Sequence, residues 1–168
     1  MLTVRTAKAE DVNKIAQLYV HNHRETYKNL LPAEYFETLT ENYAKEKWQS
    51  YIADEGSRVW VAEENGAFLG FAASTADEEL TDVWYLDSLH VCESARGRGV
   101  GTTLIKAVGK YAFDNGYKKM SICIVKGNDG AGDLYRKLGA RHYKDFTGKM
   151  SHAEKLLWED LKIFSEKL

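Results

Sequence analysis

One hexapeptide constrains this 168-residue chain more than any other segment: Arg96-Gly-Arg-Gly-Val-Gly101. It follows an apolar run that begins near Leu86, and it precedes a stretch with the apolar spacing of an amphipathic helix. Glycines let the backbone adopt conformations denied to other residues and approach a ligand closely. The first amides of a helix have no partner within it, and they carry the positive end of its dipole. A strand, a glycine-rich turn and a helix therefore predict an anion site, and phosphate is its natural occupant.

Three kinds of phosphate-binding loop are compatible with such a segment. A Walker loop requires Lys followed by Ser or Thr after its glycines, and no such pair follows these glycines. A dinucleotide fingerprint requires a third glycine where this chain has Thr102. The segment instead resembles the acyl-coenzyme A loop of the GCN5-related N-acetyltransferase (GNAT) superfamily, which reads Gln or Arg, two residues, Gly, one residue, and Gly or Ala. This resemblance implies that the coenzyme is held by the loop residues, which are Arg96, Gly97, Arg98, Gly99, Val100, Gly101 and Thr102.

A second segment matches the same family further along the chain. Asn128, Ala131, Tyr135 and Gly139 occupy all four positions of its pattern Asn-x-x-Ala-x-x-x-Tyr-x-x-x-Gly. The resemblance implies that Asn128 hydrogen-bonds the coenzyme, that Ala131 leaves room for it, and that Tyr135 directs its hydroxyl at the thioester sulfur. Gly139 is expected to end the helix with a left-handed cap. The family usually has Phe after that glycine, whereas this chain has Ala140, so we expect the local packing to differ.

The resemblance implies an acetyl-coenzyme A-dependent N-acetyltransferase that acetylates a primary amine by direct attack in a ternary complex, without a metal. In the family, the pantetheine arm pairs with the backbone of a strand that splays from its neighbour, here Leu89, His90 and Val91. Their amides can polarise the thioester carbonyl. An amine attacks only when neutral, so a base must take its proton, and an acid near the sulfur assists the thiolate. The alternative on the same fold is a catalytically silent acyl-coenzyme A sensor, and the presence of Tyr135 favours the enzyme.

The sequence leaves the general base ambiguous. Family members often carry a carboxylate on the strand before the loop, but the position that matches most directly is Tyr85. Asp87 lies two residues further on, on the same strand face by alternation, and it could activate an amine through water. We therefore predict Asp87 as the base, with His90 and Glu25 as weaker candidates. The competing interpretation of Asp87 is a solvated strand residue or an ion-pair partner.

In the family, acceptor specificity is set by the region between the first two helices and by the last strands. This chain offers aromatic rings and carboxylates there, and both attract a cationic amine. These residues are Tyr27, Tyr35, Phe36, Trp84 and Tyr85, beside Glu25, Glu34 and Asp87. Tyr35 and Phe36 fit equally well as core residues of an amphipathic helix. A small amine, a peptide N-terminus and a protein lysine all stay open as acceptors.

Composition argues against several other classes of function. The chain is 44% hydrophobic, which suits a single domain over residues 1–168. Its net charge of −2 gives no electrostatic footprint for nucleic acid. We expect a soluble, cytoplasmic protein, because no run approaches the ~18 apolar residues of a membrane span and no secretory leader opens the chain. Cys92 and Cys123 are expected to be buried, reduced thiols, and His21 and His23 to face different sides of a helix, so we expect no metal site.

Apolar periodicity predicts the element order β-α-α-β-β-β-α-β-α-β-β, an α/β (α+β) fold with a mixed, mostly antiparallel sheet and helices on both faces. That order is also the one that the family shows. The strands are expected at residues 2–6, 58–63, 68–74, 82–92, 120–125, 142–146 and 156–164. Asn65-Gly66 predicts a tight hairpin turn, and Pro32 a single aromatic-rich helix that runs to Ile52.

The aromatic-rich second helix and the last strand present more apolar surface than we expect a chain of this size to bury alone. Exposed apolar patches mark interfaces. We therefore predict a homodimer.

Overall fold

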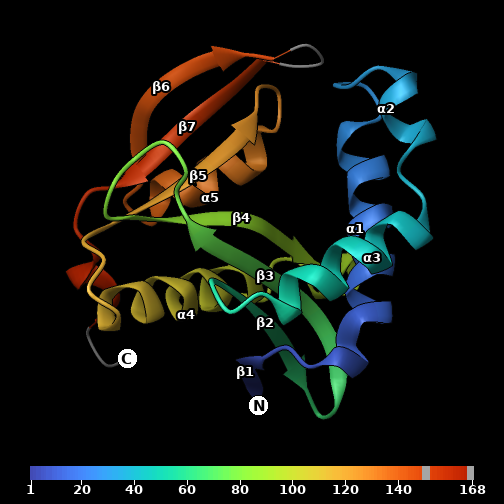
Figure 1. Cartoon of the computed structure of the whole chain (residues 1–168), viewed down its shortest axis with the longest axis horizontal. Coiled ribbons are helices and arrows are strands. Elements are labelled where there is room, and N and C mark those ends of the chain that lie inside the picture. The colour runs from blue at the N-terminus through green and yellow to red at the C-terminus, as the bar shows by residue number, and fades with distance from the viewer. Residues whose placement is uncertain (149–151, 166–168) are drawn as a thin grey trace.

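The computed structural model describes residues 1–148 and 152–165. Their backbone forms a seven-stranded sheet in the order β1-β2-β3-β4-β5-β7-β6 (Figure 1). The strands are β1 (Leu2–Thr6), β2 (Ser57–Glu64), β3 (Ala67–Ala76), β4 (Val83–Val91), β5 (Lys119–Val125), β6 (Arg141–Thr147) and β7 (His152–Trp158). The helices are α1 (Val12–Tyr27), α2 (Ala33–Glu37), α3 (Glu41–Ala53), α4 (Val100–Asp114) and α5 (Asp129–Lys137). β4 pairs with β5 in parallel and the other pairings described are antiparallel, so the predicted mixed, mostly antiparallel sheet is confirmed.

The predicted single helix from Pro32 to Ile52 is wrong, because this stretch forms two helices, α2 and α3. Thr40 has an extended backbone and its side chain accepts a hydrogen bond from the amide of Tyr43 at 3.1 Å. This N-cap starts a new helix where apolar periodicity suggested a continuous one.

The last strand also differs from the prediction, since it begins at His152 and ends at Trp158. The side chain of Asp160 accepts a hydrogen bond from the amide of Lys162 at 3.0 Å, and a short 3₁₀ helix follows at Leu161–Phe164. A side-chain bond of this kind competes with strand pairing.

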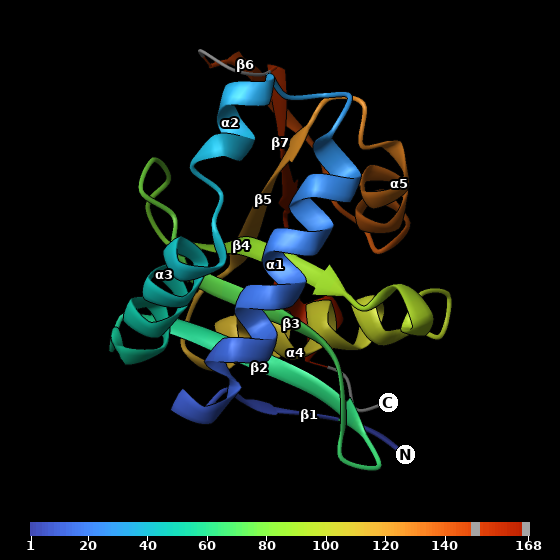
Figure 2. The same ribbon diagram turned by 90° about the vertical axis from the view of Figure 1, so that its right-hand side faces the viewer.

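The sheet carries one hydrophobic core on each face. Ile15 of α1, Trp48 of α3 and Phe71 of β3 belong to one core. Leu104 of α4 and Leu86 of β4 belong to the other, which also receives α5. Figure 2 shows α1 and α3 in front of the sheet and α4 behind it, so helices cover both faces as predicted.

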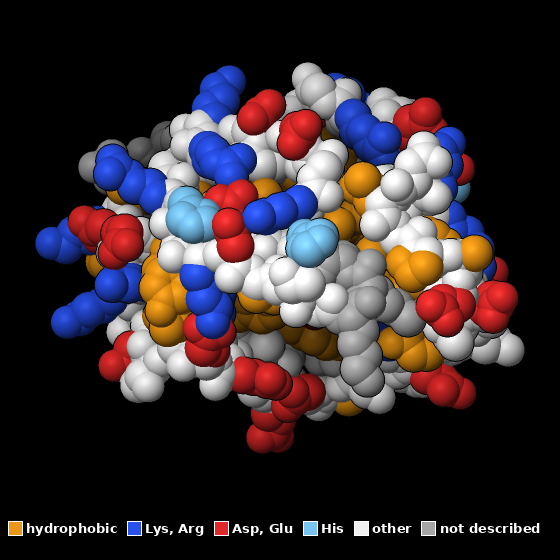
Figure 3. Space-filling model, turned by 90° about the horizontal axis from the view of Figure 1, so that it is seen from above, with side chains coloured by type: hydrophobic (Ala, Val, Ile, Leu, Met, Phe, Trp, Pro, Cys, Tyr) orange, Lys and Arg blue, Asp and Glu red, His pale blue; other side chains and the backbone are white. Residues whose placement is uncertain are grey.

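Most of the described apolar residues near the end of the chain are buried, namely Leu156, Leu157, Trp158, Leu161 and Phe164. Ile163 of the same stretch is exposed, so the apolar surface that this stretch offers to a second copy is smaller than predicted. Tyr43 of α3 is exposed, and the homodimer stays a prediction. Among the described residues, no helix has both the length and the apolar character that a membrane crossing requires. The face in Figure 3 mixes acidic and basic side chains around a hollow with a hydrophobic floor.

β4 contains a bulge that determines which side chains face the site. Ala73 of β3 pairs with Ser88 and the adjacent Ser74 pairs with Leu86, so Asp87 is the extra residue of β4. A bulge inserts one residue and shifts the alternation of side chains beyond it. Leu86 and Leu89 consequently both pack in the α4 core, although they are three residues apart. His90 then faces α1 instead.

β4 and β5 separate beyond the bulge. Their pairing runs from Val83 with Lys119 to Leu86 with Ile122 and stops there. β5 continues by pairing with β7, whereas residues 88–91 of β4 keep only their pairing with β3. The backbone of β4 therefore has a free edge where the sheet opens.

Candidate active site

The glycine-rich loop forms the N-terminal end of α4. Gly99 is the N-cap of this helix with φ +82°, and Gly97 has φ +77°. Residues with a Cβ rarely adopt this left-handed conformation. The Thr103 amide and hydroxyl both donate to the carbonyl of Gly99, at 3.0 and 2.8 Å. The helix thus begins firmly at Gly99, and its first amides are free to bind an anion.

A cavity of about 550 Å³ lies over this loop. Its lining contains two cations and no carboxylate: Leu89, Val91, Ala95, Arg96, Gly97, Gly99, Val100, Gly101, Thr102, Gly130, Ala131, Leu134, Tyr135 and Lys137. A Cβ on Gly101 would lie 3.4 Å from Cδ2 of Leu134, so this glycine keeps the cavity open beside α5. The structure therefore brings together most residues of the two motifs. Three residues predicted to bind the coenzyme lie outside this lining: Arg98, His90 and Asn128.

These three residues have other surroundings. The guanidinium of Arg98 pairs with Glu64 of β2 at 3.1 Å. Asn128 is the N-cap of α5, and with His90 it lines a second cavity. That second cavity, of about 460 Å³, lies on the α1 side of β4.

The two cavities are continuous through the opening between β4 and β5. Six residues line both of them: Leu89, Val91, Arg96, Gly130, Ala131 and Tyr135. A ligand that enters from the loop of α4 can therefore reach the α1 side of the sheet along the free edge of β4.

Tyr135 lies at this junction. Its ring is buried edge-on against Trp158, with centroids 6.1 Å apart. Burial, with a smaller contribution from nearby Tyr27, raises the pKa of Tyr135, so that its hydroxyl stays protonated at neutral pH. The predicted left-handed cap after this helix is confirmed, because Gly139 has φ +105° and the amide of Ala140 donates to the carbonyl of Tyr135 at 3.0 Å.

Asn22 of α1 links the coenzyme loop to β4. Nη2 of Arg96 donates to Oδ1 of Asn22 at 3.2 Å. Because arginine only donates, this contact assigns the amide orientation, and Nδ2 of Asn22 then donates to the carbonyl of Val91 at 3.2 Å. The same Nδ2 lies 3.4 Å from Nδ1 of His90, which therefore acts as an acceptor.

His90 is consequently poorly placed as a base. Its Nδ1 is occupied by Asn22, and its ring lies 5.3 Å from Phe71 and 5.6 Å from Tyr19, measured between centroids. Desolvation, assisted by nearby His23, keeps the pKa of His90 well below its usual range. The imidazole is therefore neutral and held in place.

Asp87, the extra residue of the bulge, lines the second cavity. It forms no ion pair with a described residue, so the interpretation as an ion-pair partner within this chain is wrong. Its removal from water raises the pKa of the carboxyl, and the charge of Lys47 partly opposes that shift. A carboxylate with a raised pKa binds a proton more readily than one in water.

A third cavity, of about 400 Å³, opens beyond Asp87. Asp87 and Cys123 line both this cavity and the second one. The remaining lining residues are Tyr51, Thr75, Asp77, Glu78, Glu79, Tyr85 and Lys155.

Five residues predicted for the acceptor site line none of the three cavities: Trp84, Glu25, Glu34, Tyr35 and Phe36. Tyr35 and Phe36 pack against the hydrophobic core on the α1 side, which favours their interpretation as core residues. Trp84 is buried on the α4 side, where its indole nitrogen donates to Oγ of Ser74 at 2.8 Å. Glu25 is exposed and pairs with Lys28 at 3.6 Å, and Glu34 is exposed on α2. Neither glutamate lines any of the three cavities, so this arrangement does not favour Glu25 as the base.

The sequence analysis missed His23, a half-buried residue that lines the second cavity, whereas His21 is exposed. Nδ1 of His23 lies 3.1 Å from the carbonyl of Tyr19 and must donate to it, which leaves Nε2 unprotonated. Burial lowers the pKa of His23 to about 4. The available signal was a pair of polar residues, Asn22 and His23, at positions where the apolar stripe of α1 should continue after Tyr19.

One group of potential metal ligands is made of residues that line none of these cavities. His142, Asp145 and Glu154, on β6 and β7, place one ligand atom each within 4.8 Å of one another. Glu154 already contacts Nδ1 of His142 at 2.6 Å and pairs with Arg136 at 2.5 Å. None of the three lines the cavities above.

Comparisons with known proteins agree with this arrangement. The model of the acetyltransferase (GNAT) family matches residues 17–140. YuaI of Bacillus subtilis, an uncharacterized N-acetyltransferase, is 29% identical over 132 residues, which cover 76% of this chain and 74% of YuaI.

Two solved structures share the fold. PaiA N-acetyltransferase of Thermoplasma acidophilum, in complex with coenzyme A, has a TM-score of 0.78 at 18% identity and covers 92% of this chain and 98% of its own. YncA of Salmonella typhimurium, with its cofactor acetyl-CoA, has a TM-score of 0.74 at 18% identity and covers 100% of this chain and 96% of its own. Because the family model matches well over half of its length, this chain belongs to the acetyltransferase (GNAT) family and is an N-acetyltransferase.

Proposed function

We propose that this N-acetyltransferase moves the acetyl group of acetyl-coenzyme A to a primary amine by direct attack in a ternary complex. The observation that carries the proposal is the passage between β4 and β5. It runs from the amides at the start of α4, past Tyr135, to the carboxylate of Asp87.

The first cavity fits the anionic end of the coenzyme. The start of α4 offers free amides and a helix dipole, and Arg96 and Lys137 add two positive charges. No carboxylate in the lining opposes a phosphate. The left-handed backbone at Gly97 and Gly99 leaves open space where a Cβ would stand.

The free edge of β4 fits the pantetheine arm. None of the strands in residues 1–148 and 152–165 pairs with residues 89–91 on the β5 side, so their backbone can pair with the amide groups of that arm. A β4 amide can also donate to the thioester oxygen, where negative charge develops during attack. The bound coenzyme supplies the activated acetyl group.

Two side chains then complete the proton balance. Asp87 accepts, through water, the proton that the amine loses as its nitrogen bonds to the acetyl carbon. Tyr135 gives its proton to the sulfur as the carbon–sulfur bond breaks, and it recovers one from solvent. The products are an N-acetylated amine and the free thiol, so no covalent intermediate on the protein is required.

The proposal is tested by measuring thiol release from acetyl-coenzyme A with a panel of primary amines, and the acetylated product by mass spectrometry. Turnover that depends on both the amine and Tyr135 is the expected result. Tight coenzyme binding without turnover on any amine would instead favour the silent sensor. Absence of coenzyme binding would refute both.

A further inference from the structure

The third cavity is an extension of the reaction centre. It meets the second cavity at Asp87 and Cys123, which line both. Its other residues come from α3, the end of β3, the loop after β3, β4 and β7. A molecule whose amine lies at Asp87 can therefore extend into this space.

Two of the four carboxylates in the third cavity are neutralised within the protein. Asp77 pairs with Lys155 at 2.7 Å, both almost inaccessible to solvent, and it accepts a hydrogen bond from the hydroxyl of Ser121 at 2.5 Å. Glu79 pairs with Lys144 at 2.7 Å.

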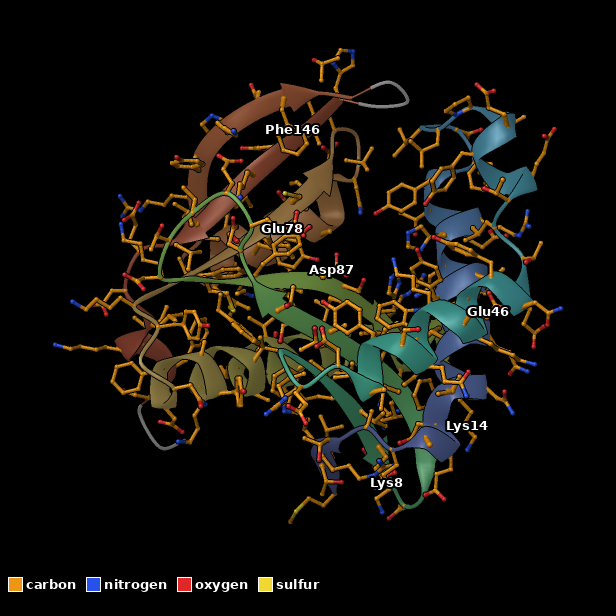
Figure 4. The ribbon with its side chains drawn as sticks, viewed as in Figure 1. Lys8, Lys14, Glu46, Glu78, Asp87 and Phe146 are labelled. Atoms are coloured by element: carbon orange, nitrogen blue, oxygen red, sulfur yellow. The ribbon has the colours of Figure 1, made fainter. Side chains whose placement is uncertain are left out.

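The other two carboxylates, Glu78 and Asp87, form no ion pair with any described residue. Figure 4 shows Glu78 on the loop after β3 and Asp87 on β4, and both line this one cavity. One cavity wall thus presents two uncompensated negative charges, one of them at the reaction centre.

The rest of the wall suits an aliphatic chain with polar ends. Tyr51 and Tyr85 contribute aromatic rings, and an ammonium group is attracted to such rings as well as to carboxylates. The hydroxyl of Tyr51 is buried beside Asp87, so this ring and this carboxylate border the same part of the cavity.

The charges change sign along the passage. The coenzyme end carries Arg96 and Lys137 with no carboxylate, whereas Glu78 and Asp87 dominate the third cavity. Lys47 lines the second cavity next to the ring of Tyr19, so a second positive charge on the acceptor is disfavoured there. The electrostatics therefore direct that charge toward Glu78.

We propose that the acceptor is a small aliphatic diamine or polyamine, with the attacked amine at Asp87 and a second, charged amine at Glu78. This inference rests on the proposed function, because it assumes acetyl transfer at Asp87. It adds the chemical class of the acceptor, which the fold alone leaves open.

The test compares three acceptors of equal chain length: putrescine, butylamine and γ-aminobutyrate. They carry at the remote end an ammonium, a methyl and a carboxylate, respectively. We expect kcat/KM to fall in that order, with putrescine favoured over butylamine by up to about fivefold, the upper end for an ion pair with an exposed carboxylate such as Glu78. A lysine-containing peptide forms a fourth arm, and its preference over putrescine would overturn the inference.

Glu78→Gln should reduce the putrescine-to-butylamine ratio by up to about fivefold, mainly through KM for putrescine. Glu46→Gln is the matched control, because Glu46 is exposed on α3, lines none of the three cavities and loses the same charge (Figure 4). Equal ratios in the wild type and Glu78→Gln would overturn the inference but leave the proposed function intact.

Calorimetry of putrescine binding to the protein saturated with coenzyme A gives a readout independent of turnover. Binding that Glu78→Gln weakens and Glu46→Gln does not is the expected result. Failure of putrescine to bind overturns the inference, whereas failure of coenzyme A to bind refutes the proposed function itself.

Discussion

The coenzyme side and the acceptor side of the passage are built in different ways. The coenzyme side uses the backbone of one continuous segment, from β4 through the loop into α4, and adds one wall from α5. The acceptor side uses side chains from α1, α3, β4, β5 and the loop after β3. Backbone groups survive most substitutions, but side-chain chemistry changes with each one. We therefore expect the coenzyme side to respond to glycine replacement and the acceptor side to single charge changes.

The largest effect should come from Gly99→Leu combined with Gly101→Leu. Leucine is strained at the φ of +82° of Gly99, and at Gly101 its side chain would occupy part of the cavity that this glycine lines. Affinity for acetyl-coenzyme A should fall by about 100-fold or more, equivalent to roughly 2.7 kcal/mol, as measured by calorimetry.

Gly66→Leu is the matched control for that double variant. Gly66 has a φ of +79° in the β2–β3 hairpin, outside the cavities. It should lower stability but keep coenzyme affinity. Undiminished affinity in the double variant would show that the loop does not hold the coenzyme.

Tyr135→Phe tests the junction between the two sides. Phenylalanine keeps the packing against Trp158, so coenzyme affinity should stay the same, while kcat falls by roughly 10²-fold, as for loss of a positioned acid. Calorimetry and initial rates measure the two quantities separately. An unchanged kcat with a genuine acceptor would make this tyrosine only a core residue.

Asp87→Asn should impair activity but increase stability. If Asp87 takes the amine proton, kcat/KM, corrected for the fraction of neutral amine, should lose its rise with pH. His23→Gln is the comparison variant, because His23 lines the same cavity as a neutral imidazole. Retention of the pH-dependent rise in Asp87→Asn would transfer the role of base to another group.

The same Asp87→Asn variant should unfold at a higher temperature at neutral pH. The folded-state pKa of Asp87 is raised above its ordinary 3.8 by burial, so ionisation costs more in the folded chain than in the unfolded one. The wild type thus loses stability as pH rises from 3.8 to the raised value. The advantage of the variant should grow over that window and vanish below it, as thermal melts at several pH values would show.

Arg96→Ala should have a smaller effect than the glycine variants. Its exposed charge is screened by salt while the backbone amides remain, so coenzyme affinity should fall only severalfold and less at high ionic strength. Calorimetry at two salt concentrations measures this. A loss as large as that of the double glycine variant would contradict the backbone-based account.

The smallest effect concerns assembly. The cavities described are lined by residues of one chain, so dilution should leave kcat/KM unchanged even if two copies associate. Light scattering at micromolar concentration tests the predicted homodimer, and a mass near 19.1 kDa would contradict it.

Local sequence patterns were sufficient to predict the structure where neighbouring residues determine it. The hairpin at Asn65-Gly66 is confirmed by φ values of +51° and +79°, and the four-residue pattern around Tyr135 ends at the predicted cap. Thr40 and Asp160 are local signals as well, but apolar periodicity outweighed them.

The acceptor side could not be predicted from such patterns. The bulge at Asp87 depends on the register between β3 and β4, and the free charge of Glu78 depends on which lysines reach its neighbours. Contacts between distant segments decide both features. Residue types alone therefore predicted Trp84 and Glu34 in the acceptor site, whereas the fold places both residues outside it.

The extra residue in β4 changes which face of the sheet each later side chain of this strand occupies. A regular strand of the same sequence would turn Leu89 toward α1 and His90 toward the apolar interior beside α4. The polar and apolar faces of β4 would then be exchanged from Leu89 to the glycine-rich loop. Deleting Asp87 would have the opposite result, because it would remove the bulge and leave Leu89 and His90 on their present faces, so that variant would lose the carboxylate but keep the orientation of the side chains beyond it.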